Sequence, residues 1–479
     1  MPELILALDV GTTNLTACIF TPAGQRLGQA SARLRTRAAL PGQVEQDPVL
    51  IWQTARKVMA RALEACGHSL ADMAAIGVTS QRTSVVFWDR KTGAALSPLV
   101  VWSDLRGADR AKALQAAGIG IVAQQAAAKL ELMLAGIETR AALLASNRLA
   151  WGNIDSYLIF KLTGGAAHVT DRSQAWPTGY LDLASRAWNL DLMGFQGLDE
   201  AMFPTLVDSW GEMGRTDLKT LGASVPIMAV IADQQAALIG QGCEARGAGK
   251  ITYGTSATVN VSTGKKFAYV GPTLPPFIVS AVGDEVTYCI EGMVFSAGNA
   301  LDWVRRNFGL GGHAAFARLT DKTQDSGGTY SLPAFQGLGA PHGDATKTGL
   351  IGGLTLSTGP GQIARAAIEG IAYRVREVVD GIYDGSGLAR PEVLRVDGGL
   401  TNNDALMQLQ ANVLGMALAR HSLREATACG AAICAARGVG LLGPEETAGF
   451  CSHDQVFEPD QDKPKADQDF ATWKTRVYG

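Results

Sequence analysis

The order of apolar runs along this chain constrains its fold more than any other feature. Short runs at 4–9, 15–20, 74–80 and 226–232 alternate with segments whose apolar residues recur at helical spacing, such as 48–66. This alternation predicts strands and helices in turn, which is the pattern of an α/β protein. The 479 residues are too many for one ordinary core, so we expect two large domains or about three smaller ones.

Composition favours a globular protein without a nucleic-acid or membrane partner. Apolar residues make up 47% of the chain, and 42 basic against 45 acidic residues leave a net charge of −3. The seven cysteines form no C-x-x-C pair, and most lie in apolar runs, as reduced core thiols do. The first residues lack the basic region of a signal peptide, and no apolar run is long enough to span a bilayer. We therefore expect a cytoplasmic protein.

The stretch ALDVGTTNLTACIF, residues 7–20, places a carboxylate between two runs that read as buried strands. A charge there costs free energy unless it is paired or binds a cation, so the stretch indicates a site. Backbone N–H groups of Gly11, Thr12 and Thr13 could form a concave anion site, and Asp9 could hold Mg²⁺ beside it. The alternative is an ordinary hairpin whose acid stabilises the turn, and the local sequence favours neither.

A weak internal repeat indicates how the chain is divided. GTTNLTACIF at 11–20 resembles GTSATVNVST at 254–263, and each follows an apolar run. We therefore expect two domains of similar build that meet near residue 245, although a chance match of this length remains open. The polar tail at 458–468 is expected to be loose or to lie along the surface.

Three further stretches carry polar residues at positions where ligands bind. Asp233 follows a buried strand and opens a helix, which suits a general base but also a plain helix cap. The glycines of RVDGGLTNND, 395–404, permit close approach to a nucleotide, or form a tight turn with asparagine caps. Arg82, Trp102 and Asp104 could line a hydroxyl-binding pocket or be ordinary core and surface residues. The six histidines are dispersed without metal-ligand spacing.

Together these motifs resemble the FGGY family of carbohydrate kinases, in its glycerol kinase-like branch. The motifs run in family order from residue 6 to about 440 and include LALDVGTTN, PGQVEQDPVLIW, AAIGVTSQR, VVWSDLR, DQQAALIGQG, TYGTSA and VDGGLTNNDALMQLQANVLG. The resemblance implies an α/β fold of two actin-like (ribonuclease H-like) domains with a catalytic cleft between them. Residues 1–245 would bind sugar or polyol and supply the base, and residues 246–479 would bind the nucleotide.

The resemblance also implies an activity, with a role for each motif. The γ-phosphoryl group of ATP would pass to a hydroxyl of a small polyol or sugar, with Mg²⁺ as cofactor. Asp233 would accept the hydroxyl proton and would lie, with Asp9, near the metal. The implied substrate-binding residues are Arg82, Thr83, Trp102, Asp104, Gln124, Gln234 and Thr258. The implied nucleotide-binding residues are Gly11, Thr12, Thr13, Gly254, Thr255, Gly298, Asp302, Gly398, Gly399 and Asn403.

Four positions depart from the glycerol kinase pattern. Thr83 stands where those enzymes carry glutamate, Gln124 near their tyrosine, Thr258 at their phenylalanine and Asp302 at a glutamine. Loss of two aromatics and a charge indicates a roomier, hydroxyl-rich pocket, so we expect a longer polyol or a ketose, with glycerol possible. The alternatives are an actin- or chaperone-like ATPase and a catalytically silent sugar sensor. The branch also implies a homo-oligomer, a dimer or tetramer.

Overall fold

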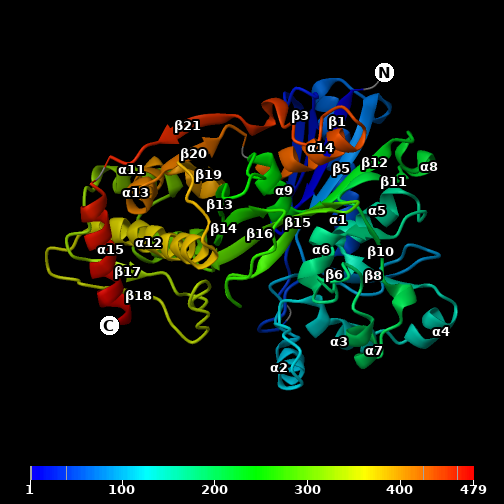
Figure 1. Cartoon of the computed structure of the whole chain (residues 1–479), viewed down its shortest axis with the longest axis horizontal. Helices are drawn as coiled ribbons and strands as arrows, with labels where there is room; N and C mark the ends of the chain where they lie inside the picture. Colours follow the sequence, from blue (N-terminus) through cyan, green and yellow to red (C-terminus); the bar gives the residue numbers. More distant parts are fainter. Residues whose placement is uncertain (1–2, 39, 424, 461) are drawn as a thin grey trace. The chain divides into compact units, whose positions relative to one another are not determined.

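The computed structural model describes residues 3–38, 40–423, 425–460 and 462–479. The chain forms two compact units (Figure 1). The first unit comprises Met1–Gly240, Ile278–Val286 and Thr427–Cys451, and the second comprises Gln241–Phe277, Thr287–Ala426 and Ser452–Gly479. The chain passes between the units within β15 (Pro276–Val282) and β16 (Glu285–Val294).

The first unit is built on a six-stranded mixed sheet with the order β11-β12-β5-β1-β2-β3. The central strands β12, β5 and β1 run parallel, whereas β1, β2 and β3 are joined by antiparallel hairpins. The strands span Trp210–Arg215 (β11), Pro226–Ala232 (β12), Met73–Ser80 (β5), Leu4–Val10 (β1), Asn14–Phe20 (β2) and Arg26–Arg33 (β3). The near-continuous burial of β12 and β5 is typical of parallel strands covered on both faces.

Helix α1 (Pro48–Cys66) covers one face of this sheet, and it spans the segment whose apolar spacing predicts a helix. The Asp47 side chain accepts hydrogen bonds from the backbone N–H groups of Val49 and Leu50. Proline occupies the first turn, where its missing N–H would have had no partner within the helix. The helix ends at Gly67, whose φ of 72° is a left-handed cap. Its buried stripe includes Ile51, Ala55, Val58, Met59 and Ala62.

A second, four-stranded sheet in this unit has the order β4-β7-β6-β8. Its strands span Glu45–Gln46, Leu99–Val100, Val85–Asp89 and Leu149–Asn153, and a two-stranded pair joins β9 (Val169–Asp171) and β10 (Thr205–Val207). The remaining helices of the first unit are α2 (Ala108–Ala116), α3 (Leu130–Ala135), α4 (Arg140–Ala145), α5 (Ile154–Leu162), α6 (Arg172–Ala175), α7 (Leu190–Phe195), α8 (Leu218–Leu221), α9 (Asp233–Gly240) and most of α14 (Ala426–Gly438).

The second unit repeats the sheet of the first. The seven-stranded sheet has the order β15-β16-β14-β13-β19-β20-β21, where β13 pairs antiparallel with β14 and parallel with β19, as β1 does with β2 and β5. The sequence repeat at 11–20 and 254–263 is therefore a structural repeat of one hairpin. The strands span Ala257–Gly264 (β14), Gly249–Tyr253 (β13), Val393–Asp397 (β19), Ala417–His421 (β20) and His453–Phe457 (β21).

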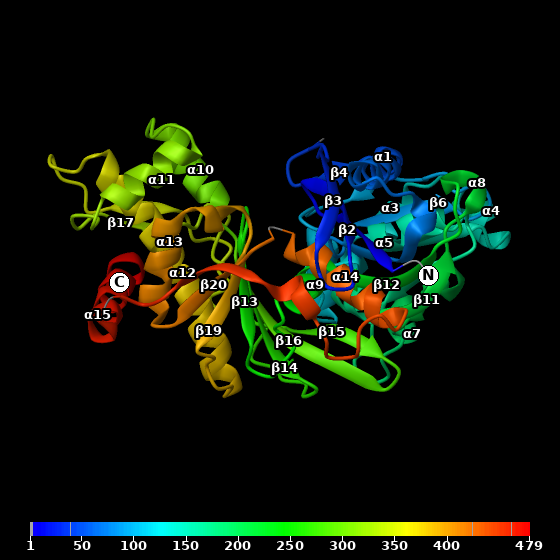
Figure 2. The ribbon, with the colours of Figure 1, turned by 90° about the horizontal axis from the view of Figure 1, so that it is seen from above.

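Helices α12, α13 and α15 lie side by side in the second unit (Figures 1 and 2). Of the two expectations for 458–468, a loose tail is wrong from Lys463 onward, because α15 begins there and buries Ala466. Most of the described residues of this stretch are exposed, as a segment along the surface would be. The other elements are α10 (Gly298–Asn307), α11 (His313–Lys322), α12 (Pro360–Ser386), α13 (Asp404–Leu414), α15 (Lys463–Tyr478) and the pair β17 (Tyr330–Leu332) and β18 (Leu350–Gly352).

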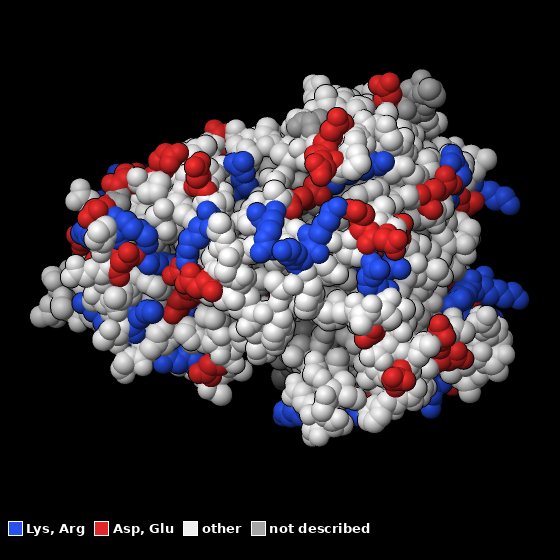
Figure 3. Space-filling view, in the orientation of Figure 1, with Lys and Arg blue, Asp and Glu red and all other residues white. Residues whose placement is uncertain are grey.

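Figure 3 shows basic and acidic side chains interspersed over the face in view, as the near-zero net charge leads one to expect. Among the described residues, no helix has the length and apolar character needed to cross a membrane.

Candidate functional site

Three charged residues from distant parts of the sequence meet at one edge of the first unit's sheet. Asp9 lies near the end of β1, Arg82 follows β5 and Asp233 follows β12, and these three parallel strands are neighbours. The three strands end level with one another, because Ser80 pairs with Val10 on one side and with Ala232 on the other. Carboxyl ends of parallel strands are where α/β proteins bind ligands, so the topology itself gathers this set.

Asp233 and Arg82 form a partly buried ion pair. Arg82 Nε lies 3.8 Å from Asp233 Oδ1, and their side chains are only 12% and 25% exposed. The backbone N–H of Gln234 donates to Asp233 Oδ1 at 2.7 Å. The carboxylate is thus held at the start of α9, within reach of a ligand, rather than inside the core.

The Thr12 hydroxyl is the centre of a polar network beside this edge. It accepts a hydrogen bond from Trp102 Nε1 at 3.0 Å and donates one to Gln81 Oε1 at 2.8 Å. Gln81 Nε2 donates to Gln46 Oε1 at 3.0 Å, and Gln46 Nε2 donates to the Thr12 carbonyl at 2.7 Å, which closes a ring. Because the Thr12 proton is already donated, this hydroxyl is an anchor for Gln81 and Trp102 in the described structure.

Thr13 differs from Thr12 in its surroundings. Its side chain is exposed, and within the described residues its hydroxyl makes no hydrogen bond. It borders a hollow of about 520 Å³ that is also lined by Arg33, Leu34, Arg35 and Thr36. Leu34 is buried, and the arginines on either side of it are exposed. The turn after β1 therefore presents a donor hydroxyl at a hollow that two arginines also line.

Asp104 is fully buried, and protein groups surround its carboxylate. Oδ1 accepts from Arg106 Nε and from the Arg106 backbone N–H, and Oδ2 accepts from Arg106 Nη2 and from the Val44 backbone N–H at 2.6 Å. Burial alone would raise the pKa of this carboxyl, but these hydrogen bonds outweigh it and lower the pKa below its ordinary value. Glu45 pairs with the same guanidinium at 2.7 Å.

The remaining residues expected on the substrate side differ in how the structure holds them. Thr83 is 7% exposed and has a φ of 52°, a left-handed conformation that is costly for a β-branched residue. Gln124 and Gln234 are half-buried in the first unit, the former in the loop before α3. Thr258 lies in β14 of the second unit and is 4% exposed.

In the second unit, the Gly254–Thr255 turn lies against the first turn of α10. Gly298 N donates to the Gly254 carbonyl at 3.1 Å, and Asn299 N donates to the Thr255 carbonyl at 3.2 Å. A Cβ at Gly298 would approach the Gly254 carbonyl to 2.6 Å, so only glycine fits this contact. The structure thus brings together two glycines that are 44 positions apart in the sequence (298 − 254).

The end of β19 forms a second glycine site in this unit. Gly398 has a φ of 94°, and a Cβ there would lie 2.3 Å from the Tyr253 carbonyl. Gly399 begins the short 3₁₀ turn to Asn402, with open space where a side chain would project. Asn403 caps α13, since its side chain accepts from Leu406 N at 3.2 Å. On α10, Asp302 accepts from Arg305 Nη2 at 3.2 Å.

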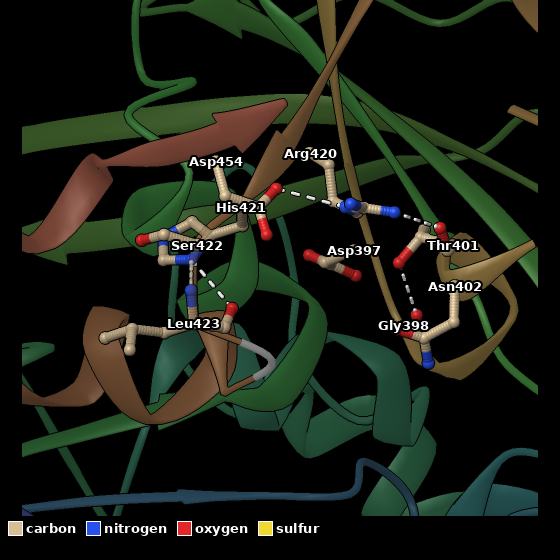
Figure 4. A pocket seen from close by; sticks show the side chains of 9 residues that line it. All are labelled: Asp397, Gly398, Thr401, Asn402, Arg420, His421, Ser422, Leu423 and Asp454. Atoms are coloured by element: carbon tan, nitrogen blue, oxygen red, sulfur yellow. Dashed lines mark hydrogen bonds and ion pairs between the residues drawn. The ribbon is translucent and has the colours of Figure 1, made fainter. Parts of the chain in front are cut away.

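A polar pocket of about 320 Å³ opens beside this turn (Figure 4). Arg420 crosses it and donates to the Thr401 carbonyl, while its Nε pairs with Asp454 at 3.0 Å. The pocket is lined by Asp397, Gly398, Thr401, Asn402, Arg420, His421, Ser422, Leu423 and Asp454.

The sequence analysis did not identify the side chains that hold the proposed site residues in place. Gln46 and Gln81 lie in stretches with family resemblance, but nothing in their sequence indicates that they bond each other. Lys129 is fully buried and donates to the carbonyls of Val101 and Trp102 at 3.2 and 3.3 Å. Burial lowers the pKa of its ammonium group to about 7. The one sequence feature that indicates this burial is the position of the lysine directly before α3, whose residues are mostly apolar.

Comparisons with known proteins cover nearly the whole chain. Residues 4–240 match the model of the N-terminal domain of the FGGY family of carbohydrate kinases, and residues 249–439 match the model of its C-terminal domain. A glycerol kinase of Alkalilimnicola ehrlichii is 38% identical over 99% of this chain and 98% of its own, and one of Rhizobium rhizogenes is 36% identical over 100% and 99%.

Solved structures show the same likeness. The crystal structure of Plasmodium falciparum glycerol kinase with ADP superposes with a TM-score of 0.92 at 25% identity, over 99% of this chain and 98% of that one. A xylulose kinase from Lactobacillus acidophilus shares the fold, with a TM-score of 0.84 at 22% identity over 98% and 96% of the two chains.

Proposed function

The chain belongs to the FGGY family of carbohydrate kinases, and from that premise we propose that Asp233 is the general base that activates a polyol or ketose hydroxyl. The chain is a two-domain α/β kinase that transfers phosphate to an alcohol, and its family uses ATP. The observation that carries the proposal is the convergence of Asp233, Arg82 and Asp9 at neighbouring strand ends.

The proposed step is one displacement. The substrate hydroxyl oxygen attacks the γ-phosphorus, the bond from that phosphorus to the β,γ-bridging oxygen breaks, and the hydroxyl proton passes to the Asp233 carboxylate. ADP leaves with the bonding electron pair. Such transfers depend on positioning and charge neutralisation more than on covalent help from the protein, which suits a base fixed by Arg82 and Gln234 N.

A magnesium ion fits the residues at the strand ends. Asp9 and Asp233 offer half-buried carboxylates at two strand ends of the same sheet. That set matches Mg²⁺, which typically takes one or two carboxylates and completes its shell with phosphates and water. We propose Asp9 and Asp233 as its protein ligands; bound there, the ion would neutralise charge on the phosphates.

We assign phosphate contacts to the turn after β1. The N–H groups of Gly11, Thr12 and Thr13 would line the phosphate chain, and Thr13 rather than Thr12 would donate its hydroxyl, since the Thr12 proton is engaged with Gln81. The exposed Arg33 and Arg35 beside Thr13 would add positive charge.

The nucleotide would be held chiefly by the second domain, 246–479, and the substrate by the first, 1–245. Two close backbone approaches support this assignment: Gly298 to Gly254, and Gly398 to β13. Both occur at glycines in turns, where the absence of a side chain lets a ligand come close to the backbone. The proposed nucleotide residues of this domain are Gly254, Thr255, Gly298, Asp302, Gly398, Gly399 and Asn403.

For the substrate we propose a polyol longer than glycerol, or a ketose. Thr83, Gln124 and Thr258 are smaller or more polar than the glutamate, tyrosine and phenylalanine of the glycerol kinase pattern, and the substrate would bind through Arg82, Trp102, Gln234 and these three. Asp104 would act indirectly, through Arg106. Glycerol is the second candidate, since the similar curated proteins are glycerol kinases.

A coupled ADP assay with Mg·ATP tests the proposal over glycerol, tetritols, pentitols, pentuloses and hexuloses. We expect at least one pentitol or pentulose to have a higher kcat/KM than glycerol. A higher value for glycerol would assign the second candidate, and turnover no greater than with water alone would favour a silent sensor or a conformational ATPase.

We also propose a cytoplasmic homo-oligomer, a dimer or tetramer. All seven cysteines lie in described residues and none forms a disulfide, as is usual in a reducing compartment. Light scattering coupled to gel filtration tests the assembly; a mass of 50.3 kDa, that of one chain, would contradict it.

A further inference from the structure

The strand ends that carry the site residues are tied together by one buried helical turn. Strands β5 and β12 are parallel neighbours, and Ser80 and Ala232 are their paired last residues. Gln81 and Arg82 follow the first of these strands, and Asp233 follows the second. Any shift of one strand end relative to the other therefore changes the separation of Arg82 and Asp233.

Both strand ends are hydrogen-bonded to α6 by adjacent residues. The Ser173 hydroxyl accepts the N–H of Ala232 at 2.9 Å. Gln174 Nε2 donates to the Ser80 carbonyl at 3.0 Å and to the Ser80 hydroxyl at 2.9 Å. Ser173, Gln174 and Ser80 are all 0% exposed, so water does not compete for these bonds.

Asp171 holds α6 in place. Its Oδ1 accepts from the Ser173 hydroxyl at 2.8 Å and from Gln174 N at 3.0 Å, and its Oδ2 accepts from the Ser209 hydroxyl at 2.7 Å. Asn153 Nδ2 adds a bond to the Gln174 carbonyl at 3.0 Å. The turn is thus clamped at its start, at its end and to a separate loop.

We propose that Ser173 and Gln174 are positioning residues, which set the geometry of Asp233 and Arg82 through the backbone of β12 and β5. The proposal rests on the proposed role of Asp233 as base. Ser173 acts on the strand end that carries the base, so it governs kcat. Gln174 acts on the strand end that carries Arg82, so it governs the KM for the sugar or polyol. Small displacements matter, since about 1 Å of misplacement costs on the order of 10²-fold in rate.

The test compares Ser173→Ala with Thr216→Val. The Thr216 hydroxyl is 2% exposed and accepts the N–H of Val225 at 2.8 Å, just before the opposite end of the same strand, β12. Each variant removes one buried hydroxyl that accepts one backbone N–H and also donates one bond, to the Asp171 carboxylate from Ser173 and to the Ala223 carbonyl from Thr216, so a purely structural role predicts similar losses in urea midpoint and similar kinetics. We expect similar midpoints but a kcat at least about tenfold lower for Ser173→Ala alone, with the KM for ATP within twofold of wild type.

Gln174→Met provides a second readout if Ser173→Ala does not fold. It keeps the side-chain length and removes the bonds to Ser80, and we expect a several-fold rise in the KM for the acceptor with a smaller effect on kcat. Equal kinetics of Ser173→Ala and Thr216→Val, or a Gln174→Met variant with wild-type KM, would overturn the inference. Substantial activity in Asp233→Asn would instead overturn the proposed base, so the two failures are distinguishable.

Discussion

Replacing Thr12 by valine removes the hydroxyl at the centre of the polar ring and keeps the shape of the side chain. Gln81 Oε1 then loses its donor in a residue that is 1% exposed, which costs about 1–3 kcal/mol because water does not replace the bond. Trp102 Nε1 loses its acceptor, but the side chain is half-buried and its N–H is partly resolvated, so it adds about 0.5–1 kcal/mol. We expect a total destabilisation of about 1.5–4 kcal/mol.

Urea denaturation monitored by tryptophan fluorescence measures this loss, with Thr13→Val as the matched control. The Thr13 side chain is exposed and makes no hydrogen bond within the described residues, so its replacement should change the unfolding free energy by less than about 0.5 kcal/mol. Kinetics should separate the pair as well: Thr12→Val raises the KM for the acceptor through Trp102 and Gln81, and Thr13→Val raises the KM for ATP.

Equal stability of the two valine variants would refute the reasoning, because it would mean that the ring around Thr12 contributes nothing. An unchanged KM for ATP in Thr13→Val would separately remove the Thr13 hydroxyl from the phosphate site. Thr12→Ser keeps the hydroxyl and should retain most of the stability.

Two further predictions concern charge. Arg33→Gln and Arg35→Gln should each raise the KM for ATP several-fold at low salt, while the exposed Arg37→Gln, which does not line the hollow, should not; equal effects would assign the change to net charge alone. Burial raises the pKa of Asp155 to about 7 and that of Asp171 to about 6, so the stabilising contribution of each neutral acid is present below pH 4 and is lost as the pH rises through the folded value. The contribution of these two acids to the unfolding free energy should therefore fall between pH 4 and 7. Asp155→Asn should remove up to about 4 kcal/mol of that fall, and the same pH dependence in variant and wild type would contradict the burial argument.

Local signals predicted much of the fold. Helix α1 followed from its apolar spacing and from Asp47, and both Gly-Thr hairpins followed from short runs that flank a turn. The strand end that carries Asp233 was predicted because a buried run gives way to a helix within one residue. These features depend on residues close together in the chain, so one sequence is enough to show them.

Long-range contacts limited the prediction of the site. Thr12 bonds residues 69 and 90 positions away, and no local pattern indicates such partners. Helix α6 has four residues, too few for a periodic signal, although it is hydrogen-bonded to two strands of the main sheet. Helix α15 was missed because its first turns are polar, and its stability comes from Phe470 and Trp473 packing on the second unit's core.

The most direct test of the proposed mechanism is the steady-state kcat of Asp233→Asn, measured with saturating Mg·ATP and the best acceptor from the panel. The substitution keeps the shape of the side chain and removes its ability to take the hydroxyl proton. We expect kcat to fall by at least about 10²-fold while the affinity for ADP stays within twofold of wild type. A kcat within a few-fold of wild type would contradict the assignment of Asp233 as the base.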